Sequence, residues 1–175
     1  MNPQNITNDW LREQHFTIEK GITITGAFLK DLTAHVDDRG DVIELWSTAW
    51  TEYKDGIVLN TAHAYQSATD PGVTKCWHLH AVHTDQFTVT RGKLQVSMID
   101  VRPNSPTFGK ANTVVLGTQK PRFLKIPAGI MHGWKALGTT ESIVVNFQSH
   151  PFDAADEFKF DWDVVLPEIW GPKNG

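Results

Sequence analysis

The amino-acid sequence predicts a mostly β domain, built as an antiparallel sandwich or barrel. The apolar runs are short and rich in Val, Ile, Thr and Phe. Turn-forming pieces separate them, namely RG, RPNSP, GTQKP, PAG and LGTT. Such spacing is typical of sheets whose consecutive strands are antiparallel. We expect roughly ten or more strands.

Helices are expected only near the two ends of the chain. Residues 7–14, TNDWLREQ, can cap and form a turn or two, and residues 153–158, DAADEF, can form another turn. The clearest strand patterns cover residues 22–29, 41–47, 86–90, 93–101, 112–117, 122–127 and 141–148. No repeat or linker interrupts them, so one domain is expected over residues 1–175, with its core at about 20–150 and a C-terminal extension over 151–175.

Charge and cysteine content exclude several classes of protein. The chain has 16 basic and 20 acidic residues, and it contains no run of Lys or Arg that would follow a phosphate backbone, so nucleic acid is not an expected partner. Cys76 is the only cysteine, which excludes an intrachain disulfide. The N-terminus is polar and no apolar stretch is long enough to span a bilayer. We therefore expect a soluble, cytoplasmic protein.

Histidines are concentrated before one of the predicted strands. Because side chains alternate along a strand, His78 and His80 share one face with Cys76. The opposite face then carries Lys75, Trp77 and Leu79.

A turn over residues 81–84 follows the histidines. In the next strand, Phe87 and Val89 share a face with Asp85 and should carry this carboxylate inward. His83 lies within the turn and is expected to be solvated. Cys76 is expected to be a small buried apolar side chain rather than a nucleophile.

Two motifs resemble those of the cupin superfamily. The first spans residues 72–92 and contains His78, His80 and Asp85, with Asp where that motif usually has Glu. The second is PAGIMH, residues 127–132, whose usual following Asn is replaced by Ala136. In metal cupins, the positions of His78, His80, Asp85 and His132 bind a divalent ion. Three imidazoles and a carboxylate suit Fe, Mn, Ni, Cu or Zn, but such residues at a barrel mouth can also bind a substrate or water directly.

Three further segments resemble dTDP-4-dehydrorhamnose 3,5-epimerases. The segment from His35 to Glu44 contains D-x-R-G-x-x-x-E, the segment from Asp100 to Gly109 contains D-x-R-x-x-S-P-T-F-G, and Ile126 to Trp134 matches I-P-x-G-x-x-H-G-F except at its last position. The likeness covers about residues 20–170. The SPTFG piece itself is expected to be a structural turn.

The resemblance implies a cupin-type double-stranded β-helix, or jelly roll, with short terminal helices. Members of the family are homodimers in which N-terminal strands add to the partner's sheet, and they invert carbons beside the C4 ketone of a nucleotide-linked deoxysugar. The implied function is therefore a cofactor-independent isomerase of carbohydrate biosynthesis. We expect the strand over residues 22–30 to pair with a second subunit, because Trp77 and Leu79 need cover.

The resemblance also implies roles for single residues. His78 aligns with the family's catalytic base, and Asn146 falls at or near the position of its catalytic tyrosine. The expected substrate-binding residues are Arg39, Glu44, Lys75, His80, Asp85 and His132. Arg39 and Lys75 are expected to meet the pyrophosphate. Asp85 replaces a family lysine, and the C-terminal aspartate that partners the family's histidine has no recognisable equivalent.

Two other functions remain open from the sequence. One is a metal-dependent cupin, either a dioxygenase or an isomerase, that uses His78, His80, Asp85 and His132 as ligands. The other is a catalytically silent jelly roll that binds sugar. Metal content would separate the first from the others.

Overall fold

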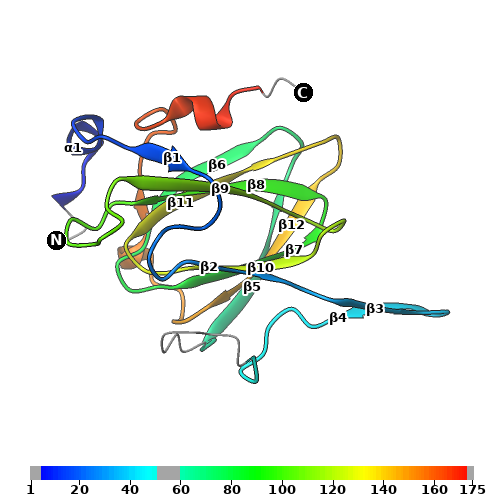
Figure 1. Cartoon of the computed structure of the whole chain (residues 1–175). Coiled ribbons are helices and arrows are strands. Elements are labelled where there is room, and N and C mark those ends of the chain that lie inside the picture. The colour runs from blue at the N-terminus through cyan, green and yellow to red at the C-terminus, as the bar shows by residue number, and fades with distance from the viewer. Residues whose placement is uncertain (1–4, 51–59, 173–175) are drawn as a thin grey trace.

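The structure, a computed structural model, describes residues 5–50 and 60–172. Two sheets face each other and form a flattened barrel (Figure 1). The six-stranded sheet contains, in spatial order, β1 (Thr17–Glu19), β9 (Lys110–Gly117), β8 (Lys93–Asp100), β11 (Ile130–Ala136), β6 (Thr74–Leu79) and β13 (Phe158–Lys159). The five-stranded sheet contains β2 (Phe28–Asp31), β10 (Arg122–Ile126), β7 (Asp85–Arg91), β12 (Ser142–Gln148) and β5 (His63–Thr69). A separate hairpin is formed by β3 (Ala34–Asp37) and β4 (Gly40–Ile43).

Helices lie near the two ends, as predicted. They are α1 (Asn8–Arg12) and the 3₁₀ turns η2 (Ala154–Asp156) and η3 (Pro167–Trp170). The Thr7 hydroxyl caps α1 by accepting a hydrogen bond of 3.1 Å from the Trp10 backbone N–H. No helix in the described part of the chain is long and apolar enough to cross a membrane.

The main core fills the space between the two sheets. Alternating side chains of both sheets point into it, as the period of two in the sequence predicts. Its buried members include Phe87, Val89, Leu94, Val96, Met98, Leu116, Leu124, Ile126, Ile130, Trp134 and Val144.

A second core covers the outer face of the six-stranded sheet. Trp77 and Leu79 are fully buried there, and the N-terminal and C-terminal segments supply the cover through Leu11 and Trp170. The rings of Trp77 and Trp170 lie 4.9 Å apart, measured between centroids. The expectation that a second subunit must cover Trp77 and Leu79 is therefore wrong, because the chain's own ends do so.

A bulge between β6 and β11 alters the predicted alternation. His78 stands opposite His132, whereas the next matched pair is Lys75 opposite Trp134, so β6 contains one residue more than β11 over this interval. Lys75 therefore lies on the face of the histidines, not on the opposite face as predicted. Gly133 fits this close crossing because a Cβ there would lie 2.3 Å from the Cβ of Cys76.

Two predicted strands are shorter in the structure. Residues 22–27 form a loop, because the Asn112 side chain replaces a strand partner by accepting hydrogen bonds from the backbone N–H groups of Thr23 and Ile24 at 2.8 and 3.1 Å. Gly26 then turns the chain with a φ of +85° before β2 begins. The strand predicted over 41–47 ends at Ile43.

The SPTFG segment is the structural turn that its composition predicts. The fully buried carboxylate of Asp100 organises it by accepting hydrogen bonds of 2.6 Å from the hydroxyls of Ser105 and Thr107. Arg102 adds bonds of 2.8 and 2.9 Å from its guanidinium to the same carboxylate. These contacts hold the β8–β9 connection in shape.

Candidate active site

A cavity of about 300 Å³ opens between the two sheets, at the low end of the range for small-molecule sites. Strands of both sheets and the C-terminal extension contribute its walls. Its lining residues are His63, Tyr65, His78, His80, His83, Phe87, His132, Trp134, Gln148, Phe152, Asp153 and Glu157. Three of the predicted site residues, His78, His80 and His132, are therefore brought together in it.

His78 is paired with a carboxylate. Its Nδ1 lies 3.3 Å from Oε1 of Glu157, which follows η2. A carboxylate beside Nδ1 holds the proton on that nitrogen, so the neutral ring carries its lone pair on Nε2. Burial lowers the pKa of His78 to about 4, with the charge of His132 acting in the same direction and that of Glu157 opposing it. The ring is thus a neutral base near pH 7.

His80 and His132 share the carboxylate of Asp85. Their Nε2 atoms lie 3.5 and 3.2 Å from the same oxygen, Oδ2. Each ring uses its Nδ1–H on a backbone carbonyl, that of Asp156 at 2.8 Å for His80 and that of Ile130 at 3.0 Å for His132. A ring in that tautomer can donate to Asp85 only if it also carries a second proton. Both rings therefore present Nε2 to one carboxylate oxygen.

The pKa of Asp85 reflects this environment. Burial opposes its ionisation, but the hydrogen bond and charge of His132, the charge of His80 and the hydrogen bond of Asn146 outweigh burial and lower its pKa. Burial also lowers the pKa of His80, against the attraction of Asp85. Asp85 is therefore a buried carboxylate that stays ionised.

The same three residues fit a divalent metal ion. One ligand atom from each of His80, Asp85 and His132 lies within 4.8 Å of the others, and both imidazoles are oriented by Nδ1–H bonds, as metal ligands commonly are. A metal bound there would act as a Lewis acid toward a ketone oxygen. His78 is not in this group, since its Nδ1 faces Glu157. The structure thus gathers three of the four predicted metal ligands.

Asn146 lies behind the cavity rather than among its lining residues. It is fully buried, and its Nδ2 donates to Oδ1 of Asp85 at 2.6 Å and to the Tyr65 hydroxyl at 3.0 Å. Its Oδ1 accepts from the backbone N–H of Gln86 at 2.9 Å. Gln148 donates to the same Asp85 oxygen at 3.0 Å. Asn146 and Gln148 therefore fix the orientation of Asp85.

His83 is buried, so the expectation of a solvated turn residue is wrong. Its Nδ1 lies 2.5 Å from Oδ2 of Asp156 and its Nε2 lies 2.8 Å from the carbonyl of Pro151. Asp156 also accepts the backbone N–H groups of Ala81, Val82 and His83 at 2.7 to 3.1 Å. This anchor ties the turn after β6 to the C-terminal extension, which carries Glu157.

Three predicted substrate contacts lie elsewhere. Of the described residues that line the cavity, none is Arg39, Glu44 or Lys75. Arg39 lies in the turn of the β3–β4 hairpin, which extends away from the barrel (Figure 1), and Glu44 follows β4. Lys75 donates from Nζ to the Ser67 hydroxyl at 3.0 Å and to the Ala68 carbonyl at 2.6 Å, both on β5. Their roles in binding stay predictions.

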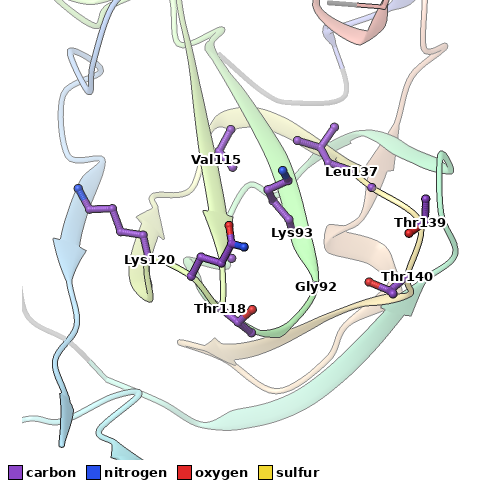
Figure 2. A pocket seen from close by; sticks show the side chains of 11 residues that line it. Gly92, Lys93, Val115, Thr118, Lys120, Leu137, Thr139 and Thr140 are labelled. Carbon is purple, nitrogen blue, oxygen red and sulfur yellow. The ribbon is translucent and has the colours of Figure 1, made fainter. Parts of the chain in front are cut away.

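A second cavity, of about 440 Å³, is formed by turns that connect the strands (Figure 2). Lys93 and Lys120 are its charged lining residues, and threonines line much of the rest. None of its lining residues in the described part of the chain is a histidine or a carboxylate. It therefore lacks the acid–base groups that the smaller cavity gathers.

Sequence reasoning missed two functional groups of the smaller cavity. Tyr65 lies on β5, whose sequence HAYQSAT is too polar to stand out as a strand, although its alternation places His63 and Tyr65 on one face. Glu157 is one carboxylate among several near the C-terminus, and no local pattern connects it with His78. Only the folded chain brings them together.

Known proteins resemble this chain over most of its length. The sequence profile of the dTDP-4-dehydrorhamnose 3,5-epimerase family matches residues 21–169. The probable low-salt glycan biosynthesis epimerase Agl13 of Haloferax volcanii is 33% identical over 129 residues, covering 73% of this chain and 80% of that protein. The spore coat polysaccharide biosynthesis protein SpsL of Bacillus subtilis is 32% identical over 142 residues, covering 80% and 91%.

A solved structure leads to the same group of proteins. The dTDP sugar isomerase of Desulfovibrio desulfuricans superposes with a TM-score of 0.75 at 26% identity, covering 86% of this chain and 94% of that one. These similarities confirm the predicted cupin-type jelly roll and the prediction of an epimerase-like enzyme of the isomerase class. Because the family profile spans most of the sequence, this protein belongs to the dTDP-4-dehydrorhamnose 3,5-epimerase family.

Proposed function

We propose that this enzyme removes a proton beside the C4 ketone of a nucleotide-linked 4-keto-6-deoxysugar, with His78 as the base. The pairing of His78 with Glu157 in the imidazole-lined cavity is the observation that carries this proposal. It supplies a neutral imidazole with its lone pair on Nε2, which is the state that a general base needs.

The reaction requires charge stabilisation as well as a base. When Nε2 of His78 takes the proton from C3 or C5, the electrons of the C–H bond delocalise onto the C4 oxygen. The imidazoles of His80 and His132, held over Asp85, are the polar groups of the cavity wall that we assign to face that oxygen, because preorganised polar groups in a buried site cost little reorganisation. These imidazoles take the place of the family lysine with which Asp85 aligns.

The binding of the nucleotide portion of the substrate is linked to the oligomeric state. We infer a homodimer in which the β3–β4 hairpin extends toward the partner. The hairpin pairs only with itself among the described strands, and Val36 and Val42 are 75% and 70% exposed. The hairpin also carries Arg39, and Glu44 follows it. In a dimer, these two residues would be able to contact the diphosphate of a nucleotide bound by the partner subunit.

Substitution of the base tests the proposed function. His78→Asn keeps a polar side chain of similar size but removes the base, and loss of a general base typically lowers rates about 10²- to 10⁴-fold. The measurement is uptake of solvent deuterium at C3 and C5 of dTDP-4-keto-6-deoxyglucose, followed by NMR. An unchanged uptake rate in folded His78→Asn would exclude His78 as the base.

A further inference from the structure

Tyr65 is placed to deliver a proton into the cavity. It lines the cavity from β5, and its ring lies against His63 with centroids 5.5 Å apart. In the strand register, Tyr65 stands directly opposite Asn146 of β12. Residues directly opposite in an antiparallel pair point to the same face of the sheet, so the two side chains reach the same region.

The hydrogen bond between them leaves the phenolic proton free. Asn146 Nδ2 donates to the Tyr65 oxygen at 3.0 Å, so the hydroxyl is the acceptor in this bond. Within residues 5–50 and 60–172, no other hydrogen bond engages this hydroxyl. Burial, partly offset by the Asn146 bond and reinforced by the charge of Asp85, raises the pKa of Tyr65 to about 12. The phenol therefore keeps its proton at neutral pH.

Asn146 cannot fill that role itself. A carboxamide is a hydrogen-bond donor but not an acid at neutral pH, and Asn146 already bonds Asp85, Tyr65 and the backbone of Gln86. Its amide instead connects the phenol to the buried Asp85 carboxylate. Asn146 is thus a positioning residue for two groups of the site.

Inversion at carbon needs this second group. A base that removes a proton and returns it to the same face restores the starting configuration, so an acid must act on the opposite face. Of the lining histidines, His78 is paired with Glu157, whereas His80 and His132 are paired with Asp85. The other two are also engaged, His63 with Gln148 and His83 with Asp156. Tyr65 is the neutral hydroxyl donor in the lining.

We propose that Tyr65 is the catalytic acid, and this inference rests on the proposed function of the site. His78 Nε2 takes the proton from the substrate carbon and the electron pair moves to the C4 oxygen as an enolate. The enolate then takes the phenolic proton on its other face, which reforms the ketone and forms the new C–H bond. The phenolate recovers a proton from water, and the His78 imidazolium releases one.

The test separates proton removal from inversion. In D₂O, dTDP-4-keto-6-deoxyglucose is incubated with wild type, Tyr65→Phe and His78→Asn, and NMR follows both deuterium uptake and configuration at C3 and C5. Tyr65→Phe should retain deuterium uptake while its rate of inversion falls at least about 10²-fold. His78→Asn should lose both. Thr88→Val is the matched control, because it deletes a buried hydroxyl of the same sheet that has no hydrogen-bond partner.

Circular dichroism must first show that the variants are folded. Every result other than the expected one then counts against the role of Tyr65 or against the proposed function. Inversion by Tyr65→Phe at the wild-type rate would overturn the role of Tyr65 and leave the proposed function intact. Loss of both uptake and inversion in Tyr65→Phe would also overturn it, since Tyr65 would then act in proton removal. No uptake by wild type would remove the proposed function and this inference with it.

Discussion

At the scale of single residues, burial sets the protonation states in the cavity. Because the pKa of His78 is lowered and that of Tyr65 is raised, a neutral base and a neutral acid coexist across the physiological pH range. Asp85 remains ionised despite burial because His132, His80 and Asn146 surround it. Opposed pKa shifts of this kind separate the acid from the base in many active sites.

The pH dependence of kcat/KM should reveal the lowered pKa of His78. Protonation of His78 abolishes the base, so activity falls as the pH drops through its pKa of about 4 in the folded enzyme. Burial and the charges of His132, His80 and Lys159 lower this value and Glu157 raises it. We expect an acidic limb near pH 4 to 5, with tryptophan fluorescence confirming that the protein remains folded. A limb near the ordinary imidazole value of about 6.5 would contradict this environment for His78.

Glu157 should act through His78 rather than on the substrate. Loss of the buried carboxylate of a Ser-His-Asp triad lowers kcat about 10⁴-fold, and Glu157 is more exposed, so we expect Glu157→Gln to lower kcat about 10²-fold with little change in KM. Glu157→Asp should recover part of the loss. The exposed Glu168→Gln serves as the control. A Glu157→Gln enzyme with raised KM and normal kcat would instead make Glu157 a substrate contact.

Some of these residues could be predicted from the sequence and others could not. Alternation along strands and the cupin-like spacing identified His78, His80, Asp85 and His132, which the structure gathers around one cavity or directly behind it. The partners of these residues come from segments with no local signal. Glu157, for example, reaches His78 only because the C-terminal extension folds back over β6.

At the scale of elements, bulges and loops depart most from the strands that the sequence predicts. The bulge in β6 turns Lys75 to the face of His78, which a period of two could not predict. The strand predicted over residues 22–29 was wrong over 22–27, because an Asn112 side chain substitutes for strand pairing. The long strands β8 and β12 were predicted well. The burial of β12 alternates along the strand, whereas β8 is buried at every residue after Lys93 because both faces of its sheet are covered.

Among the contacts between elements, we expect those of Asp156 with residues 81–83 to contribute most to stability. Asp156→Ala leaves the buried His83 ring and three backbone N–H groups without their acceptor. We expect a loss of about 2 to 3 kcal/mol in the free energy of unfolding, measured by urea denaturation. The exposed Asp163→Ala should change it by less than about 0.5 kcal/mol. Equal effects of the two substitutions would show that the anchor does not stabilise the fold.

At the scale of the whole molecule, the two ends of the chain cover the outer face of the six-stranded sheet, whereas the β3–β4 hairpin stays exposed. The N-terminal and C-terminal segments lie over the six-stranded sheet (Figure 1), where Leu11 and Trp170 cover Trp77. The β3–β4 hairpin has no such cover within the described chain, and its Val36 and Val42 are largely exposed. The family resemblance predicts the jelly roll from sequence, but the packing of the termini depends on contacts between distant segments.

The proposed homodimer predicts a solution mass of twice the 19.7 kDa chain, measured by light scattering at micromolar concentration. Val36→Lys and Val42→Lys together should weaken the dimer, because both valines are largely exposed on the hairpin and a charge there opposes burial. Val73→Lys, at a 42% exposed position outside the hairpin, should leave it intact. A strictly monomeric wild type would contradict the proposed assembly.

Deuterium uptake by wild-type protein from which metal has been removed tests most directly whether His78 is the base. The protein is dialysed against a chelator, its metal content is measured by mass spectrometry, and dTDP-4-keto-6-deoxyglucose is then followed by NMR in D₂O. Base catalysis by His78 predicts exchange at C3, C5 or both, at the same rate before and after metal removal. Exchange that disappears with the metal and returns with it, while His80, Asp85 and His132 hold the ion, would contradict metal-independent base catalysis by His78.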